Sequence, residues 1–125
     1  MDFGNIVAGS MPGSITLAPA GNRTSTNGAS LPSNAGTISV ASFKVSGEFN
    51  YSYTITLPQT VVLSRQAGNE TMLVDGFQSF PSGTGTLNAS GSQVLNIGAT
   101  LHTDANQPTG HYTTLSPFEV VVNYN

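Results

Sequence analysis

Hydrophobic and polar residues alternate with a period of two along most of the chain, and no segment shows the spacing of an amphipathic helix. The clearest alternation runs from Phe49 to Leu57, where odd positions are apolar or aromatic and even positions are Asn, Ser or Thr. A strand of this kind turns one face toward a core and the other toward water. The sequence therefore predicts an all-β protein.

Other segments repeat this alternation more briefly. The predicted strands are residues 15–17, 37–40, 41–45, 60–64, 71–77, 95–101 and 118–124. The apolar face inverts between Val40 and Ala41, because Ile38 and Val40 are apolar at even positions whereas Ala41 and Phe43 are apolar at odd ones. This inversion predicts a bulge or a strand that crosses from one sheet to the other.

Segments rich in Gly, Pro, Asn and Ser separate these strands and are predicted to be turns or loops. They are residues 9–13, 18–36, 68–69, 81–85, 89–91 and 105–110. The longest of them, from Ala18 to Gly36, is interpreted as a loop or a connection between sheets. Short strands at this spacing are typical of a sandwich or barrel, and residues 1–125 fit a single domain.

Composition narrows the classes of function. Only 7% of the residues are charged, against roughly 25% in an average soluble domain, and Ser, Thr, Asn, Gln and Gly take their place. With three Lys and Arg residues and a net charge of −3, the chain lacks the basic patch that nucleic acid or an anionic membrane surface requires. No apolar run is long enough to span a membrane, and no signal peptide is recognisable after Met1.

Candidate chemistry is sparse. Cysteine is absent, and no two of the six acidic residues fall in a motif that brings them together. Asp75-Gly76 is interpreted as turn chemistry. The two histidines, His102 and His111, are expected to be exposed, and two are too few for a zinc site without other ligands. Tyr51 and Tyr53 share a face with Phe49 and Ile55, which favours a core or groove lining over a sugar-stacking platform. We therefore expect no catalytic, cofactor-binding or metal site.

The order of several short motifs resembles a family of small secreted bacterial domains of unassigned function, which is similar in turn to spore coat protein U and to chaperone–usher pilus subunits. Those motifs are DFGNI (2–6), FKVSGE (43–48), YTITLP (53–58), MLVDGF (72–77), GTL (85–87), IGATL (97–101), GHY (110–112) and VVVNY (120–124). The resemblance implies an immunoglobulin-like (pilin-like) antiparallel β-sandwich. It also implies that Tyr112 is a corner tyrosine whose hydroxyl bonds back to the main chain.

The chain departs from the family pattern at two places. A strand of alternating Ala, Thr and Val normally precedes the DFG element, so the resemblance implies a sandwich that lacks its first strand. Thr114 stands where the family has glycine, and Pro117, which has no N–H to donate, predicts that its segment starts a strand or lies on an edge. In pilus subunits an N-terminal extension completes the sandwich of a neighbour, a form of β-augmentation.

These observations predict a secreted structural subunit of a pilus, filament or surface coat that assembles by donor-strand complementation. The expected partners are copies of the same chain, with a periplasmic chaperone or a host-surface glycan as further partners. The face expected to form the core or the strand-accepting groove comprises Phe3, Ile6, Phe118, Val120, Val122 and Tyr124. The alternative is a stand-alone adhesive or carbohydrate-binding module with a complete sandwich.

Overall fold

A computed structural model of the chain describes residues 2–3, 6–31, 38–65, 68–107, 112–113 and 120–124, with the backbone alone described at 2–3 and 112–113. The described residues form strands without any helix. The strands are β1 (Asp2–Phe3), β2 (Val7–Leu17), β3 (Arg23–Ser30), β4 (Ile38–Ser39), β5 (Ala41–Ser46), β6 (Ser52–Thr56), β7 (Val61–Arg65), β8 (Thr71–Phe80), β9 (Thr84–Thr86), β10 (Ser92–Thr103), β11 (Tyr112–Thr113) and β12 (Val121–Tyr124).

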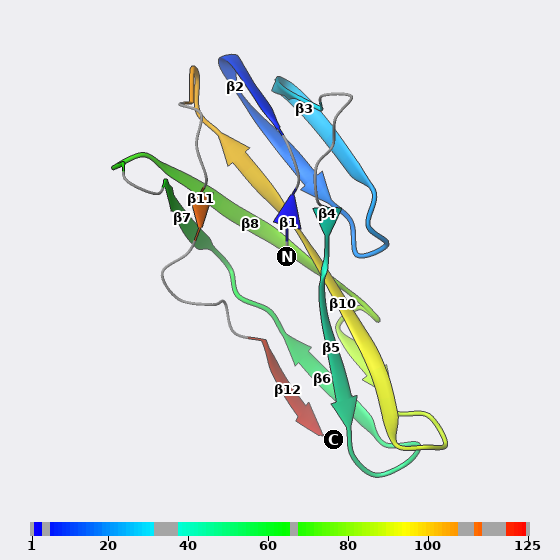
Figure 1. Cartoon of the computed structure of the whole chain (residues 1–125). Helices are drawn as coiled ribbons and strands as arrows, with labels where there is room; N and C mark the ends of the chain where they lie inside the picture. Colours follow the sequence, from blue (N-terminus) through cyan, green and yellow to red (C-terminus); the bar gives the residue numbers. More distant parts are fainter. Residues whose placement is uncertain are drawn as a thin grey trace.

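The strands form three antiparallel sheets, arranged as a sandwich (Figure 1). The large sheet has the order β11-β7-β8-β10-β2-β3, and β5 joins it by pairing with β10. A smaller sheet has the order β12-β6-β9, and β1 pairs with β4 in a third. The expected all-β, immunoglobulin-like sandwich is confirmed.

Strand β10 holds the large sheet together, because three strands share its two edges. Along one edge it pairs with β8. Along the other, its first half pairs with β5, from Ser92 to Ile97, and its second half pairs with β2, from Ala99 to Thr103. Figure 1 shows β10 running the length of the molecule between these neighbours. The predicted alternation from Leu95 to Leu101 is confirmed, since all four odd positions are buried.

The core has two clusters. The first lies between the large sheet and the β12-β6-β9 sheet and comprises Ala41, Val45, Tyr53, Ile55, Leu87, Leu95 and Ile97. The second comprises Val74, Ala99 and Leu101, with Ile6 among the half-buried side chains packed against it. Leu95 and Ile97 are fully buried, and each such side chain contributes about 1.5–3 kcal/mol relative to leaving it exposed.

The inversion of the apolar face after Val40 marks a crossing between sheets, which is one of the two predicted alternatives. Strand β4, just before it, pairs with β1, whereas β5, just after it, pairs with β10 in the large sheet. The change of phase puts Ala41 and Val45 into the first core cluster.

Three of the predicted loops are wrong in part, and the shortest overlap is at residues 81–85, whose last two residues begin β9 (Thr84–Thr86). Residues 9–13 lie inside β2 as an irregularity, where four residues between Ala8 and Gly13 face the single Gly28 of β3. The stretch from Ala18 to Gly36 contains β3, which pairs with β2 along most of its length; residues 32–36 lie outside the described part. Strand β3 was missed because it is almost entirely polar, and Ala29 is its one buried side chain.

Two smaller expectations also need correction. Asp75-Gly76 is not a turn but a β-bulge within β8: Gly76 and Phe77 face the single Ala99 of β10, and Gly76 adopts a φ of +59°. The strand expected from Phe49 to Leu57 is shorter, because Phe49 and Asn50 form a turn in which Asn50 has a φ of +62°.

Candidate functional site

A groove of about 380 Å³ opens between β5 and β12 on one side of the sandwich. Its lining comes from three strands and from Val120, which directly precedes β12. The lining residues are Phe43, Lys44, Val45, Ser46, Leu95, Val120, Val122 and Tyr124. Figure 1 shows the ends of β5 and β12 converging beside the C-terminus.

The two strands that border the groove are edge strands of different sheets. Among the described residues, β5 pairs with β10 alone and β12 pairs with β6 alone. Each therefore presents one edge of backbone N–H and C=O groups that no other described strand pairs with. Within the described part of the chain, no strand bridges β5 and β12, and the groove lies between them.

Phe43 shows how incompletely the groove is filled. It alternates with Ala41 and Val45 on the inner face of β5, and both of those neighbours are buried. Phe43 itself is 41% exposed, although Leu95, its partner in the register with β10, is fully buried. The described residues therefore cover this inward-facing phenylalanine only in part.

Tyr124 lines the groove and contacts the end of β5. Its hydroxyl donates a hydrogen bond to the carbonyl oxygen of Ser46, which joins the two edges. Its ring lies against Gly47, where a Cβ would come within 3.0 Å of Tyr124 Cε1. The position next to β5 therefore favours glycine, because a larger residue would push this ring away.

Tyr53 lies beneath the same region and pairs in register with Tyr124. It is fully buried, and its hydroxyl donates a hydrogen bond to Gln93 Oε1. Burial raises the pKa of the Tyr53 phenol above its ordinary value of 10.0, and the charge that Tyr124 would carry on ionising adds to this rise. The Tyr53 phenol therefore stays a neutral donor across the physiological range.

The structure distributes the predicted groove residues over several places. Val120 and Val122 pack against the first core cluster and line the groove, and Tyr124 lines its end. Ile6 packs against the second cluster instead and does not line the groove. Phe118 and the side chains of Phe3 and Tyr112 lie outside the described residues, as does His111. The corner role of Tyr112 therefore stays a prediction.

Sequence reasoning did not place Phe43, Lys44 and Leu95 in the groove. Their alternation placed Phe43 and Leu95 on inward faces, and that signal was correct. The alternation contains no information on strand order, so it could not predict that β5 and β12 border the same groove.

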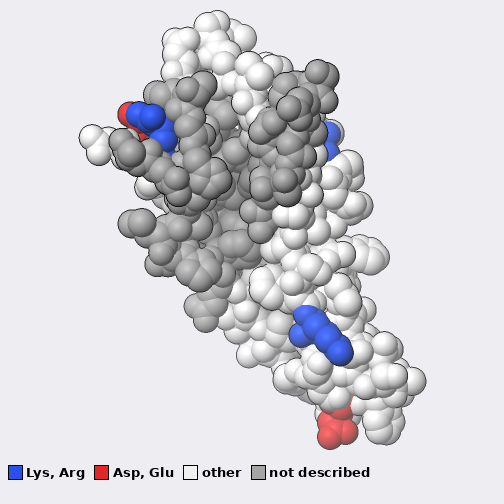
Figure 2. All heavy atoms as spheres, viewed as in Figure 1, with Lys and Arg blue, Asp and Glu red and all other residues white. Residues whose placement is uncertain are grey.

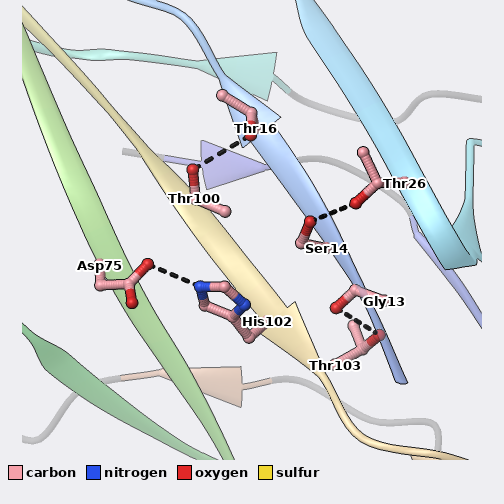
Figure 3. Close-up of polar contacts among 8 residues, drawn as sticks. All are labelled: Gly13, Ser14, Thr16, Thr26, Asp75, Thr100, His102 and Thr103. Carbon is pink, nitrogen blue, oxygen red and sulfur yellow. Dashed lines mark hydrogen bonds and ion pairs between the residues drawn. The ribbon is translucent and has the colours of Figure 1, made fainter.

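A polar array covers the outer face of the large sheet (Figure 3). His102 Nε2 lies 2.6 Å from Asp75 Oδ1, and Ser14, the register partner of His102, bonds to Thr26 at 2.5 Å. Thr16 and Thr100 are bonded at 3.0 Å. The His102–Asp75 pair was not predicted from the sequence, because the two residues are joined only by the register of β8 and β10. Both side chains are more than one third exposed, so the pair lies on an open face.

Charged groups are few elsewhere on the molecule. On the face shown in Figure 2, the described charged side chains form only separate small groups. One is the ion pair of Arg65 with Glu70, whose hydrogen bond holds the pKa of Glu70 below its usual value. Within the described residues, no three His, Asp or Glu side chains lie close enough to hold a metal ion. No helix in that part of the chain could span a membrane.

The fold defines the protein as an immunoglobulin-like β-sandwich, in which β5 and β12 each have a single partner among the described strands. The chain belongs to the family described as a domain of unknown function, DUF4402, which matches residues 1–124. No curated protein matches the chain, and no solved structure does.

Proposed function

We propose that this protein is an extracellular structural subunit that accepts a β-strand from a second copy of the chain into the groove between β5 and β12. The exposure of Phe43 carries the proposal. An inward-facing aromatic side chain between two buried neighbours has a place in the core, and a further strand over the groove would bury it.

The groove offers both components of strand recognition. The edges of β5 and β12 provide backbone donors and acceptors, which bind an extended segment regardless of its sequence. Phe43, Leu95 and Val122 provide an apolar floor for alternate side chains of that segment. A strand with apolar residues at every second position is therefore the expected occupant.

The composition and the motif order support the same function. Only 7% of the residues are charged, so two copies can approach with little loss of charge solvation. Among the described residues that line the groove, Lys44 alone is charged. The resemblance to spore coat protein U and to pilus subunits points to assembly outside the cell. We accordingly place the protein at the cell surface, in a structural rather than a catalytic role.

The test measures mass in solution by light scattering across a range of concentrations. We expect the native chain to self-associate and Phe43→Lys to be monomeric, because a charge would be buried in the groove on strand addition. Val121→Lys is the matched control. Val121 is also 41% exposed, but it alternates with Val122 on β12 and does not line the groove. This variant should associate like the native chain, with circular dichroism confirming that both variants are folded.

Two results contradict the proposal. A native chain that stays monomeric up to about 1 mM has no strand exchange of useful affinity, since that concentration already detects an association of about −4 kcal/mol. In that case Lys44 on β5 acts to keep the edge unpaired, as edge lysines do. Equal loss of association in Phe43→Lys and Val121→Lys would place the contact outside the groove.

A further inference from the structure

A second and larger cleft lies on a different part of the sandwich, with a volume of about 800 Å³. Its walls come from the turn after β2, the end of β6, the second half of β8, the turn before β9 and one residue of β10. The lining residues are Ala18, Pro19, Ala20, Ile55, Leu57, Phe77, Gln78, Ser79, Phe80, Ser82, Gly83 and Asn96. It shares no residue with the groove between β5 and β12. Its volume lies within the range of ligand pockets, roughly 300–1,000 Å³.

Hydrogen bonds hold the turns that form its walls. The N–H of Ile55 donates to the carbonyl of Gly83 at 2.8 Å, and the Ser79 hydroxyl donates to the carbonyl of Pro81 at 2.7 Å. On the other wall, the N–H of Gly21 donates to the carbonyl of Ala18 at 2.8 Å. A ligand would meet a surface that is already formed, which lowers the ordering cost of binding.

The lining selects against charged ligands. None of the described residues that line the cleft is charged. A phosphate, carboxylate or ammonium group entering it would lose its water shell without gaining a counter-charge. The polar side chains that a ligand could reach are the amides of Gln78 and Asn96 and the hydroxyl of Ser82, since Ser79 is buried. Such groups exchange hydrogen bonds with neutral hydroxyls and amides.

An aromatic ring stands beside these amides. Phe80 is 72% exposed, the highest exposure among the large hydrophobic residues described. It pairs in register with Asn96 across β8 and β10, which places the ring and the amide as direct neighbours on the sheet. A flat apolar ring next to a donor and acceptor pair matches a pyranose, which has one apolar C–H face and a rim of hydroxyls.

We propose that this cleft binds a neutral saccharide, with the Phe80 ring against the sugar face and the amides of Asn96 and Gln78 on its hydroxyls. The site is independent of the strand-accepting groove. A subunit that assembles through one side of the sandwich would then present a sugar-binding cleft on another, which joins structural and adhesive roles in one domain.

The test titrates the isotope-labelled full chain with neutral oligosaccharides of glucose, mannose, galactose and N-acetylglucosamine, and with sialylated and sulfated ones, by nuclear magnetic resonance. We expect at least one neutral oligosaccharide to shift the amide signals of residues around Phe80 and Asn96. Phe80→Ala should raise its Kd about 10-fold and Asn96→Ala several-fold, as loss of a ring contact or a paired hydrogen bond does. Phe49→Ala is the matched control, because Phe49 is 61% exposed and lies outside the cleft. It should bind like the native chain.

Three results would overturn the proposal. The first is that no neutral oligosaccharide binds at about 10 mM, a concentration that would nearly saturate a site with a millimolar Kd. The others are that charged glycans bind and neutral ones do not, or that Phe80→Ala binds sugar as tightly as the native chain. Light scattering on the same variants separates this proposal from strand exchange. A loss of association in Phe80→Ala without any sugar binding identifies the cleft as a contact between copies and also rejects the saccharide.

Discussion

The buried phenol of Tyr53 allows a quantitative prediction for a single atom. The substitution Tyr53→Phe removes the hydroxyl that donates to Gln93 Oε1 and keeps the ring in the first core cluster. Gln93 is half-buried, so its amide oxygen would lose a partner that water replaces only in part. We expect a loss of about 1–2 kcal/mol of unfolding free energy. For a domain of this size that corresponds to a fall in Tm of about 3–8 °C.

The measurement is urea unfolding followed by circular dichroism, because the chain has no tryptophan. The midpoint should fall while the slope with denaturant stays unchanged. Tyr51→Phe is the control: Tyr51 is 53% exposed, and its hydroxyl should contribute little. Tyr53→Ala sets the upper limit, since removing a buried aromatic ring costs about 3–5 kcal/mol.

The same residue predicts a pH dependence. The pKa of Tyr53 is raised in the folded protein, so the folded state keeps its proton when the unfolded chain has lost it. The stabilising contribution is complete below the ordinary value of 10.0 and is lost as the pH rises through the folded pKa. Native protein should therefore lose stability more steeply than Tyr53→Phe above pH 10.0. Equal stability of Tyr53→Phe and Tyr51→Phe, or parallel alkaline profiles of native protein and Tyr53→Phe, would contradict a stabilising role for the Tyr53 hydroxyl.

Two further predictions concern packing and acid stability. Gly98→Ala should lower the free energy of unfolding by about 3 kcal/mol or more, measured in urea, because the new Cβ would overlap the backbone carbonyl oxygen of Leu17. Gly47→Ala should cost less, because its Cβ would meet side chains that can move, and the reverse order of the two variants would contradict this prediction. Glu70→Gln should lower Tm at neutral pH and converge with the native chain as the pH falls below 4.5. The lowered pKa of Glu70 stabilises the fold only while the carboxylate is ionised, so a constant difference down to about pH 3 would show that the Arg65 pair has no part in it.

Much of the fold follows from local pattern. The alternation of apolar and polar residues identified β10, β5 and the buried half of β6, because period-two burial is imposed by the backbone of each strand by itself. The inversion at Val40 and Ala41 indicated either a bulge or a change of sheet, and the structure has the change of sheet. Strand β3 shows the limit of this signal: its side chains are polar on both faces, and only pairing with β2 makes it a strand.

The groove, the cleft and the His102–Asp75 pair depend on which strands lie next to each other in the folded protein. Phe43 and Val122 are far apart in the chain, and neither the alternation nor the composition indicates that they border one groove. The same holds for Phe80 beside Asn96 and for Asp75 beside His102, which the register of β8 and β10 brings together. The sequence alone determined which face of each strand is apolar, because residues two positions apart in a strand point to the same face. Only the tertiary structure decided which edges are left unpaired, because strand order follows from packing contacts between distant segments.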